Sequence, residues 1–534
     1  MAALARSAAC AARVAAAAAA FTLGAALLPA HADELSEAQQ RGKQIYFEGT
    51  SPRGTEITAV VGDEAAMLPG STMPCSSCHG SDGLGRPEGG VIPLDIRWSE
   101  LVKTYGHVHH DGRRHPAFDD DSFVRSMIAG IDPANNSLER SMPMYQMSGE
   151  DMADLVAYMK VLEYDLDPGV AEDSVQVATL LPLSGRAGET GEAMRVVLEG
   201  YFNDINEDGG VFGRRIELMT VPMGDTAETS LGILREAFAS EGFFALVGAY
   251  TIGLDDELLT YLRSDNVPLV GPFTLDPGDA YFDAAAFYLY AGLDQQARVL
   301  ADRAVADGAA AGEVLIASPS GGRLEPLTGA ASAQVRAKGG EGEATVVNWA
   351  PGSFDAAAFA DKLAETGVQA LLFFGAQPDL DALLAEFEKR DEAPRIYLLS
   401  SLTARPLTEL PSLFDGRVFL AYPTLTNDIT QKGRKEYQQL AETYSLPREH
   451  IQAQLAAFAA AQLFVEGLRK AGRNLSRVKL VEGLESLYQF DTGVTPPLSY
   501  GPNRRIGARG AHILTLDVEN KTYRPVGDGW FEMQ

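Results

Sequence analysis

The stretch MPCSSCHG, residues 73–80, decides how we interpret the fold of the first third of this 534-residue chain. Two thiols, Cys75 and Cys78, stand three residues apart, and the imidazole of His79 follows directly. On one helical turn this spacing turns both sulfurs to the same side of the backbone. The only other cysteine is Cys10, so a chain of this length does not rest on a disulfide framework. Cys75 and Cys78 are therefore expected to have a function other than a structural disulfide.

The C-x-x-C-H spacing is the pattern of covalent haem attachment. Both sulfurs can form thioethers with the haem vinyl groups, and His79 then reaches the iron as proximal ligand. One alternative is a thioredoxin-like redox pair, which needs a βαβ context that the flanking sequence lacks. The other is half of a zinc site, which needs two more ligands nearby. We therefore predict one haem c, covalently bound at Cys75 and Cys78.

The N-terminus is typical of a secretory signal. Arginines and no acidic residue accompany the apolar run Val14–Leu28, which ends in the small-x-small sequence Ala30-His31-Ala32. A retained membrane anchor is the alternative, because the run is nearly long enough to span a bilayer. We predict a signal peptide over residues 1–32, cleavage near Ala32, a periplasmic location and no membrane insertion of the mature chain.

A second iron ligand is expected downstream of the motif. A helix is predicted around residues 41–46, before the motif, and another begins at Ser148, where Asp151 completes a capping-box type of start. Between the motif and this last helix lies the loop SMPMY, residues 141–145.

In this order of elements, residues 33–165 resemble class I cytochrome c, which is all-α. The resemblance places the axial methionine at Met142, with Met144 and Met147 as rivals. It implies His79/Met142 ligation, which raises the reduction potential relative to a bis-histidine iron. A filled iron site favours electron transfer over oxygen or peroxide chemistry.

Four of the eight histidines lie within nine residues of one another. They are His107, His109, His110 and His115. One interpretation is a metal site or an alternative iron ligand. The interpretation that we favour is an exposed polar loop beside the haem, with Arg113 and Arg114 near its propionates.

A linker is predicted over residues 166–174, where Pro, Gly and acidic residues occur without periodicity. From residue 175 to residue 534, short apolar strands alternate with amphipathic helices. Such alternation predicts parallel sheets covered on both faces. Because about 360 residues exceed one comfortable core, we expect two α/β lobes.

This second part resembles the type I periplasmic binding proteins, most of all their branched-chain amino-acid and amide-binding branch. The resemblance rests on LPLSG at 181–185, on N-x-x-N-x-x-GGVFGR at 203–214, and on later landmarks in the same order: Val247-Gly248, Val267-Pro268-Leu269 and Ala471-Gly472. It implies two Rossmann-like lobes, a three-strand hinge, and a small-molecule ligand in the cleft between the lobes.

The resemblance also implies positions for the ligand pocket. These are Thr190, Thr251, Phe273, Thr274, Gln377 and Ser401. Ile252 and Leu275 stand where the family's hydroxyl-rich carboxylate cradle would continue, and no clear acidic partner for an α-ammonium follows. We therefore expect a neutral or weakly polar ligand rather than an ordinary amino acid. The acidic pair Asp255-Asp256 is interpreted as a solvated face or as charge at a helix N-terminus.

The formal net charge of −29, from 44 basic and 73 acidic residues, disfavours nucleic acid as a partner. The second part contains no G-x-S-x-G, H-E-x-x-H or phosphate-binding loop, and we expect no enzymatic activity.

The predicted function is single-electron transfer by a periplasmic c-type cytochrome fused to a solute-binding module. Its redox partner would be a periplasmic dehydrogenase or another cytochrome. The alternative is the substrate-binding component of an ABC-type importer that carries a haem domain and works with an ABC permease. A haem enzyme acting on the bound ligand is disfavoured by the filled iron site.

Overall fold

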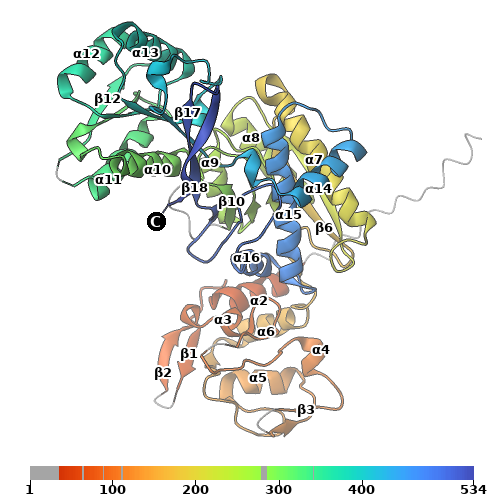
Figure 1. Cartoon of the computed structure of the whole chain (residues 1–534). Coiled ribbons are helices and arrows are strands. Elements are labelled where there is room, and N and C mark those ends of the chain that lie inside the picture. The colour runs from red at the N-terminus through yellow and green to blue at the C-terminus, as the bar shows by residue number, and fades with distance from the viewer. Residues whose placement is uncertain are drawn as a thin grey trace, which may run out of the picture. The chain divides into compact units, whose positions relative to one another are not determined.

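A computed structural model describes residues 35–534, apart from 63–64, 88, 110–111, 278–284, 341 and 534. It divides the chain into two compact units, one ending at Asp165 and one beginning at Leu166 (Figure 1). The predicted signal peptide and its cleavage site lie outside the described residues.

The first unit is mainly helical, as predicted. Its helices are α2 (Glu37–Glu48), α3 (Cys75–His79), α4 (Trp98–Leu101), α5 (Asp120–Ala129) and α6 (Gly149–Met159). Two small antiparallel sheets accompany them, one in the order β2-β1-β5 and one formed by β3 and β4. The strands are β1 (Thr58–Val61), β2 (Ala66–Pro69), β3 (His107–Val108), β4 (Arg114–His115) and β5 (Met144–Gln146). The all-α prediction missed these sheets, because β1 and β2 come from the long stretch between α2 and the C-x-x-C-H motif.

Helices α2 and α6 have clear local starts and pack closely together. The side chain of Ser36 accepts from the backbone N–H of Gln39, whose side chain accepts in return from the N–H of Ser36, a capping box. Ser148 caps α6 in the same position by accepting from the N–H of Asp151. The close approach needs Gly42, since a Cβ there would lie 2.0 Å from the carbonyl oxygen of Asp154.

The second unit contains two large sheets. The first has six strands in the order β16-β10-β9-β8-β6-β7. They are β6 (Ser174–Leu181), β7 (Arg215–Pro222), β8 (Leu246–Val247), β9 (Leu269–Val270), β10 (Ala286–Tyr290) and β16 (Ile506–Ala508). All neighbouring strands in this sheet are parallel.

The second sheet has seven strands in the order β12-β11-β13-β14-β15-β17-β18. They are β11 (Val314–Pro319), β12 (Thr345–Trp349), β13 (Ala370–Phe373), β14 (Arg395–Leu399), β15 (Val418–Tyr422), β17 (Gly510–Asp517) and β18 (Thr522–Glu532). The predicted parallel arrangement holds from β12 to β15, whereas β17 and β18 run antiparallel to their neighbours.

Helices cover both faces of each sheet, as the alternation of strands and helices predicted (Figure 1). The helices are α7 (Gly188–Glu207), α8 (Ala227–Glu241), α9 (Asp255–Ser264), α10 (Leu293–Ala306), α11 (Glu325–Lys338), α12 (Ala356–Thr366), α13 (Gln377–Arg390), α14 (Gln431–Thr443), α15 (Ile451–Ala471) and α16 (Arg477–Glu485). Strand β6 illustrates the burial. Val175 and Val177 enter the core under α7, α15 and α16, while Ala178 and Leu180 enter the core under α8 and α9. Both faces of the strand are therefore apolar.

The two sheets define two lobes that the chain links three times. It passes from the first sheet to the second after β10, returns after β15 through α14 to α16, and passes again between β16 and β17. These three crossings are the connections of the expected hinge. Residues 166–174 pack against the lobe that contains the first sheet. The side chain of Asp167 accepts from the N–H of Arg477, and Gly169 lies against Phe244.

Helix α15 is long and apolar enough to cross a membrane, and no other helix among the described residues passes that test. Of its most apolar stretch, 78% is buried inside the unit. That burial is typical of a core helix.

Candidate haem cavity

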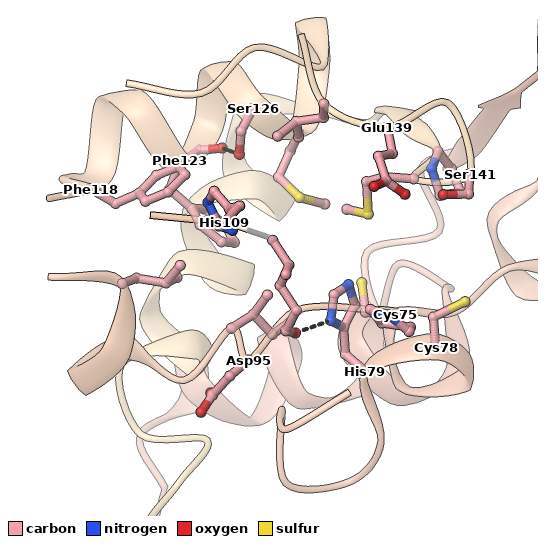
Figure 2. Close-up of a pocket in the computed structure, with 18 of the residues that line it drawn as sticks. Cys75, Cys78, His79, Asp95, His109, Phe118, Phe123, Ser126, Glu139 and Ser141 are labelled. Carbon is pink, nitrogen blue, oxygen red and sulfur yellow. Dashed lines mark hydrogen bonds between the residues drawn. The ribbon is translucent and has the colours of Figure 1, made fainter. Parts of the chain in front are cut away.

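The first unit contains a cavity with about 1260 Å³ of space free of protein atoms, solvent at its mouth included. Its apolar walls come from α5 and α6, through Phe123 (Figure 2) and through Met127, Leu155 and Met159. Polar residues enter it from the C-x-x-C-H helix, from the loop before β5 and from the β3–β4 hairpin.

Cys75 and Cys78 both line this cavity from α3. Burial raises the pKa of the Cys75 thiol to about 12. A thioredoxin-like pair needs the opposite, an attacking thiol whose pKa is lowered toward neutrality. The environment of Cys75 therefore argues against the redox-pair alternative.

His79 is the buried end of α3, with 6% of its surface exposed. Its Nδ1 lies 3.0 Å from the carbonyl oxygen of Leu94 (Figure 2). Because a carbonyl oxygen can only accept, Nδ1 carries the proton, and the lone pair of Nε2 is left for a metal. Burial lowers the pKa of His79, although the bond to Leu94 opposes this. The imidazole thus stays neutral and oriented, which is the state that ligates iron.

Met142 lines the same cavity, beside Ser141 and Pro143. The rival Met144 lies in β5 instead, and Met147 packs against the apolar core of the unit. Neither of the two rivals is among the described residues that line the cavity. The structure therefore brings Met142 together with Cys75, Cys78 and His79.

Two tyrosines that the sequence analysis did not single out fix the turn around the motif. The hydroxyl of Tyr46 on α2 donates to the carbonyl oxygen of Gly80 at 2.7 Å. The hydroxyl of Tyr145 on β5 donates to the carbonyl oxygen of Met73 at 2.6 Å. They clamp the two ends of the motif, and only the spatial neighbourhood of α2 and β5 reveals this role.

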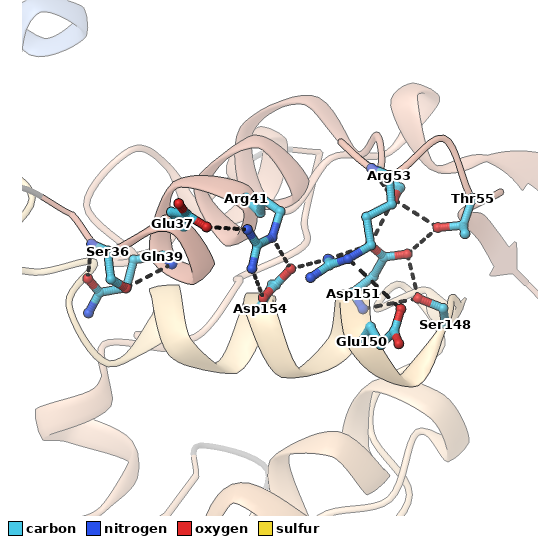
Figure 3. A network of polar contacts seen from close by, with 11 residues as sticks. Ser36, Glu37, Gln39, Arg41, Arg53, Thr55, Ser148, Glu150, Asp151 and Asp154 are labelled. Carbon is cyan, nitrogen blue, oxygen red and sulfur yellow. Dashed lines mark hydrogen bonds and ion pairs between the residues drawn. The ribbon is translucent and has the colours of Figure 1, made fainter.

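A polar network holds α2 and the loop after it against α6 (Figure 3). Asp154 accepts from Arg41 at 2.8 Å and from Arg53, and Asp151 accepts from Ser51 at 2.7 Å and from further hydroxyl groups. Burial alone would raise the pKa of both carboxyls. The hydroxyl and guanidinium donors outweigh it and hold the pKa of each below the usual range.

The three described histidines of this group do not lie in an exposed loop, contrary to the favoured interpretation. His115 is buried, His107 and His109 are half-buried, and all three line the cavity together with Arg113. Among the described residues no group of acidic, histidine or cysteine side chains could hold a further metal ion. His110 lies outside the described residues.

In the second unit, the structure brings three of the predicted pocket residues together. The hydroxyls of Thr251 and Thr274 both donate to Oδ1 of Asp255, the latter at 2.7 Å. The carbonyl oxygen of Phe273 accepts from the N–H of Thr251, and its ring packs against Tyr250 with 5.8 Å between centroids. All of these residues belong to the loops at the carboxyl ends of β8 and β9, or to α9.

Asp255 is the first residue of α9, which agrees with the interpretation as charge at a helix N-terminus, whereas the other interpretation, a solvated face, is wrong for this residue. It is not a solvated residue, because only 10% of its side chain is exposed, and burial raises its pKa against the effect of its donors. Its Oδ2 lies 3.2 Å from Arg323, which belongs to the other lobe. The sequence offered no signal for this pair, since 68 residues separate its members.

The other three predicted pocket residues make separate contacts. Thr190 on α7 lies 3.1 Å from Nδ1 of His450. Gln377, at the start of α13, accepts from the N–H of Ala404 at 2.7 Å. Ser401 is exposed in the short helix after β14.

Comparison with known families accounts for both units. The model of the family described as periplasmic binding protein matches residues 174–521, and the model described as cytochrome c matches residues 71–163. A cytochrome c domain implies a haem cofactor, and the cavity meets that demand with two thiols, an imidazole nitrogen and a thioether sulfur. No curated protein matches the chain significantly.

Similar solved structures share the fold of the second unit. One is a fatty acid ABC transporter substrate-binding protein from Thermomonospora curvata, 17% identical, with a TM-score of 0.51 over 69% of this chain and 95% of that one. Another is a branched-chain amino acid ABC transporter protein from Thermus thermophilus with bound valine, 15% identical, with a TM-score of 0.52 over 67% and 97%. A third is a putative branched-chain amino acid ABC transporter protein from Rhodospirillum rubrum, 16% identical, with a TM-score of 0.53 over 66% and 100%.

At these identities the likeness concerns the fold. The family match covers most of the chain, and the cytochrome c match lies before it in the sequence. The chain therefore belongs to the periplasmic binding protein family and carries a cytochrome c domain ahead of its binding module.

Proposed function

We propose that this protein is a periplasmic one-electron carrier whose single haem c is attached at Cys75 and Cys78 and ligated by His79 and Met142. One observation carries the proposal: these four side chains converge on one largely apolar cavity. The haem, when bound, supplies a one-electron couple. Leu94 fixes the ring of His79 through its carbonyl oxygen, and the apolar walls from α5 and α6 exclude water.

The proposed organisation follows the two units. Residues 1–32 direct export and are cleaved near Ala32, residues 33–165 carry the haem, and residues 166–174 connect them to the binding module at 175–534. The two family matches are typical of exported proteins. The redox partner is a periplasmic dehydrogenase or another cytochrome.

The binding module is proposed to hold a small molecule between its lobes. Thr251, Phe273 and Thr274 would contact it from the first lobe, where the structure brings them together. Thr190, Gln377 and Ser401 complete the proposed set on the strength of the resemblance alone. Binding would favour the closed form, because contacts to both lobes are made only there.

The ligation is tested by three matched substitutions, Met142→Leu, Met144→Leu and Met147→Leu, which conserve side-chain volume. The exported wild type should be red, with the haem retained after denaturation in acid. Only Met142→Leu should lower the reduction potential strongly and change the visible spectrum, because only it removes an iron ligand. A colourless wild type, or a Met144→Leu or Met147→Leu variant that reproduces the effect, would refute the proposed site.

The family match favours a second function, that of the substrate-binding component of an ABC-type importer with a permease as partner. The double variant Cys75→Ala/Cys78→Ala cannot attach haem covalently. Solute uptake and electron transfer are therefore measured separately in cells that make this variant. If solute uptake persists in these cells at the wild-type rate while electron transfer to the periplasmic acceptor stops, both functions operate independently. Loss of uptake alone, with no electron-transfer defect, would favour the importer.

A further inference from the structure

Three imidazoles stand face to face on the wall of the haem cavity. His107 on β3 pairs in register with His115 on β4, and His109 follows on the same face because strand residues alternate. The ring centroids of His107 and His115 lie 5.0 Å apart, and those of His109 and His115 lie 4.9 Å apart. We call His107, His109 and His115 the imidazole trio. Figure 2 shows His109 on the side of the cavity opposite Cys75 and Cys78.

The hydrogen bonds limit how many protons the imidazole trio can hold. Nδ1 of His115 lies 2.8 Å from the carbonyl oxygen of Pro116 and must donate to it. Nε2 of His115 lies 2.8 Å from Nε2 of His109, so a single proton lies between these two nitrogens. A second proton there would set two N–H groups against each other. Among the described residues no hydrogen-bond partner reaches the buried Nε2 of His107, so an added proton there would be an unsatisfied buried donor. The His109–His115 pair can therefore gain one proton, and with it one positive charge.

Charged groups from several elements lie near the imidazole trio. Glu100 on α4 places Oε1 3.8 Å from Nδ1 of His107, which favours a proton on the trio. Arg113, on the hairpin itself, opposes it, but the fully buried carboxylate of Asp132 lies 3.6 Å from that guanidinium and offsets its charge. Asp95 and Glu139 line the same cavity. Across an apolar cavity, charges interact far more strongly than in water.

We propose that the imidazole trio is a proton-binding site coupled to the haem electron, so that reduction of the domain is accompanied by uptake of a proton by a fraction of the molecules. The inference rests on the proposed haem function. One electron comes from a one-electron protein donor and is stored at the iron; one proton comes from solvent and is stored on the trio. The added electron removes one positive charge from the cavity and so favours the proton. Both leave when an acceptor protein takes the electron.

Linkage makes the effect reciprocal. Reduction should increase the proton affinity of the imidazole trio about tenfold, within the ~5–150-fold range typical of coupled sites. Protonation should then favour the reduced state by the same factor. The reduction potential should therefore fall with rising pH by a total that approaches 59 mV, the equivalent of a tenfold change for one electron. Above and below this interval the potential should be flat.

The test uses the full-length holoprotein in a redox titration at several pH values. In the wild type the reduction potential should fall with rising pH over one interval. In His107→Gln this fall should be smaller, and in the double variant His109→Gln/His115→Gln it should be absent. His450→Gln, a histidine of the other unit, is the matched control and should behave as the wild type. A red wild type with a flat potential, or a slope that survives in the His109/His115 double variant, would overturn the inference and leave the proposed haem function standing.

A measurement on the unaltered protein covers the case in which a variant fails to mature. Ring-nitrogen NMR shifts of the histidines are followed against pH in the oxidised and the reduced protein. The coupling is supported if the shifts of the imidazole trio change at a higher pH in the reduced protein than in the oxidised protein. Identical titrations in both redox states refute it. A wild type without haem absorbance would instead refute the proposed function itself.

Discussion

Replacing Gly42 by alanine should loosen the helix pair that supports the haem cavity. A Cβ at Gly42 would lie 2.0 Å from the carbonyl oxygen of Asp154 and 2.7 Å from Cβ of Tyr158. Real Cβ atoms essentially never come within 3.0 Å of another atom, so α2 and α6 would have to separate by about 1 Å. Neither obstacle can rotate away, because one is backbone and the other is fixed to it.

The magnitude follows from two opposing effects. Overpacking of this kind costs about 1–3 kcal/mol, and more where nothing can yield. Alanine recovers about 1 kcal/mol of helix propensity over glycine. The net loss of unfolding free energy should be about 2 kcal/mol. For a unit of this size that is about 6–10 °C in the unfolding midpoint.

Soret circular dichroism of the holoprotein reports on the first unit alone and is the appropriate assay. The control is Gly149→Ala at the first position of α6, where a Cβ meets no atom within 4 Å. That variant should be as stable as the wild type or slightly more stable. A Gly42→Ala midpoint within about 1 °C of the wild type would show that the helices are not in the close contact on which the reasoning depends.

Two further predictions concern charged groups. The folded-state pKa of Asp151 and of Asp154 is lowered, so their contribution to stability is complete above the ordinary aspartate pKa of about 3.9 and is lost as the pH falls through the lower folded value. The unfolding midpoint followed by the Soret signal should accordingly fall below about pH 4. In Asp154→Asn the midpoint should depend less on pH in this range. An unchanged pH dependence would contradict the role of Asp154. Arg323→Ala removes the ion pair with Asp255 and should raise the open fraction of the ligand-free binding module about two- to fivefold, as expected for a half-exposed pair. Spin-label distances between the lobes measure this, with Arg336→Ala, which breaks an exposed pair with Glu343 inside one lobe, as the matched control; equal distance distributions in both variants would reject the role.

Much of the fold was determined by the sequence, because its causes are local. The apolar alternation that began at Val175 reproduced the doubly covered sheets, since strands with two buried faces must be apolar on both. The two small sheets of the first unit and the reversal at β17 and β18 escaped prediction. Short polar strands carry little periodic signal, and strand direction depends on which distant segment lies alongside.

The same division applies to the candidate sites. The spacing of Cys75, Cys78 and His79 by itself indicated haem, because that chemistry is contained in one helical turn. Met142 was already expected from the resemblance to class I cytochrome c, and the structure adds that it lines the cavity while Met144 and Met147 are not among the described lining residues. The inward position of the imidazole trio was decided by tertiary structure alone. Burial and proton sharing depend on side chains that meet across the fold, whereas a sequence gives the order of residues and not the distances between their atoms.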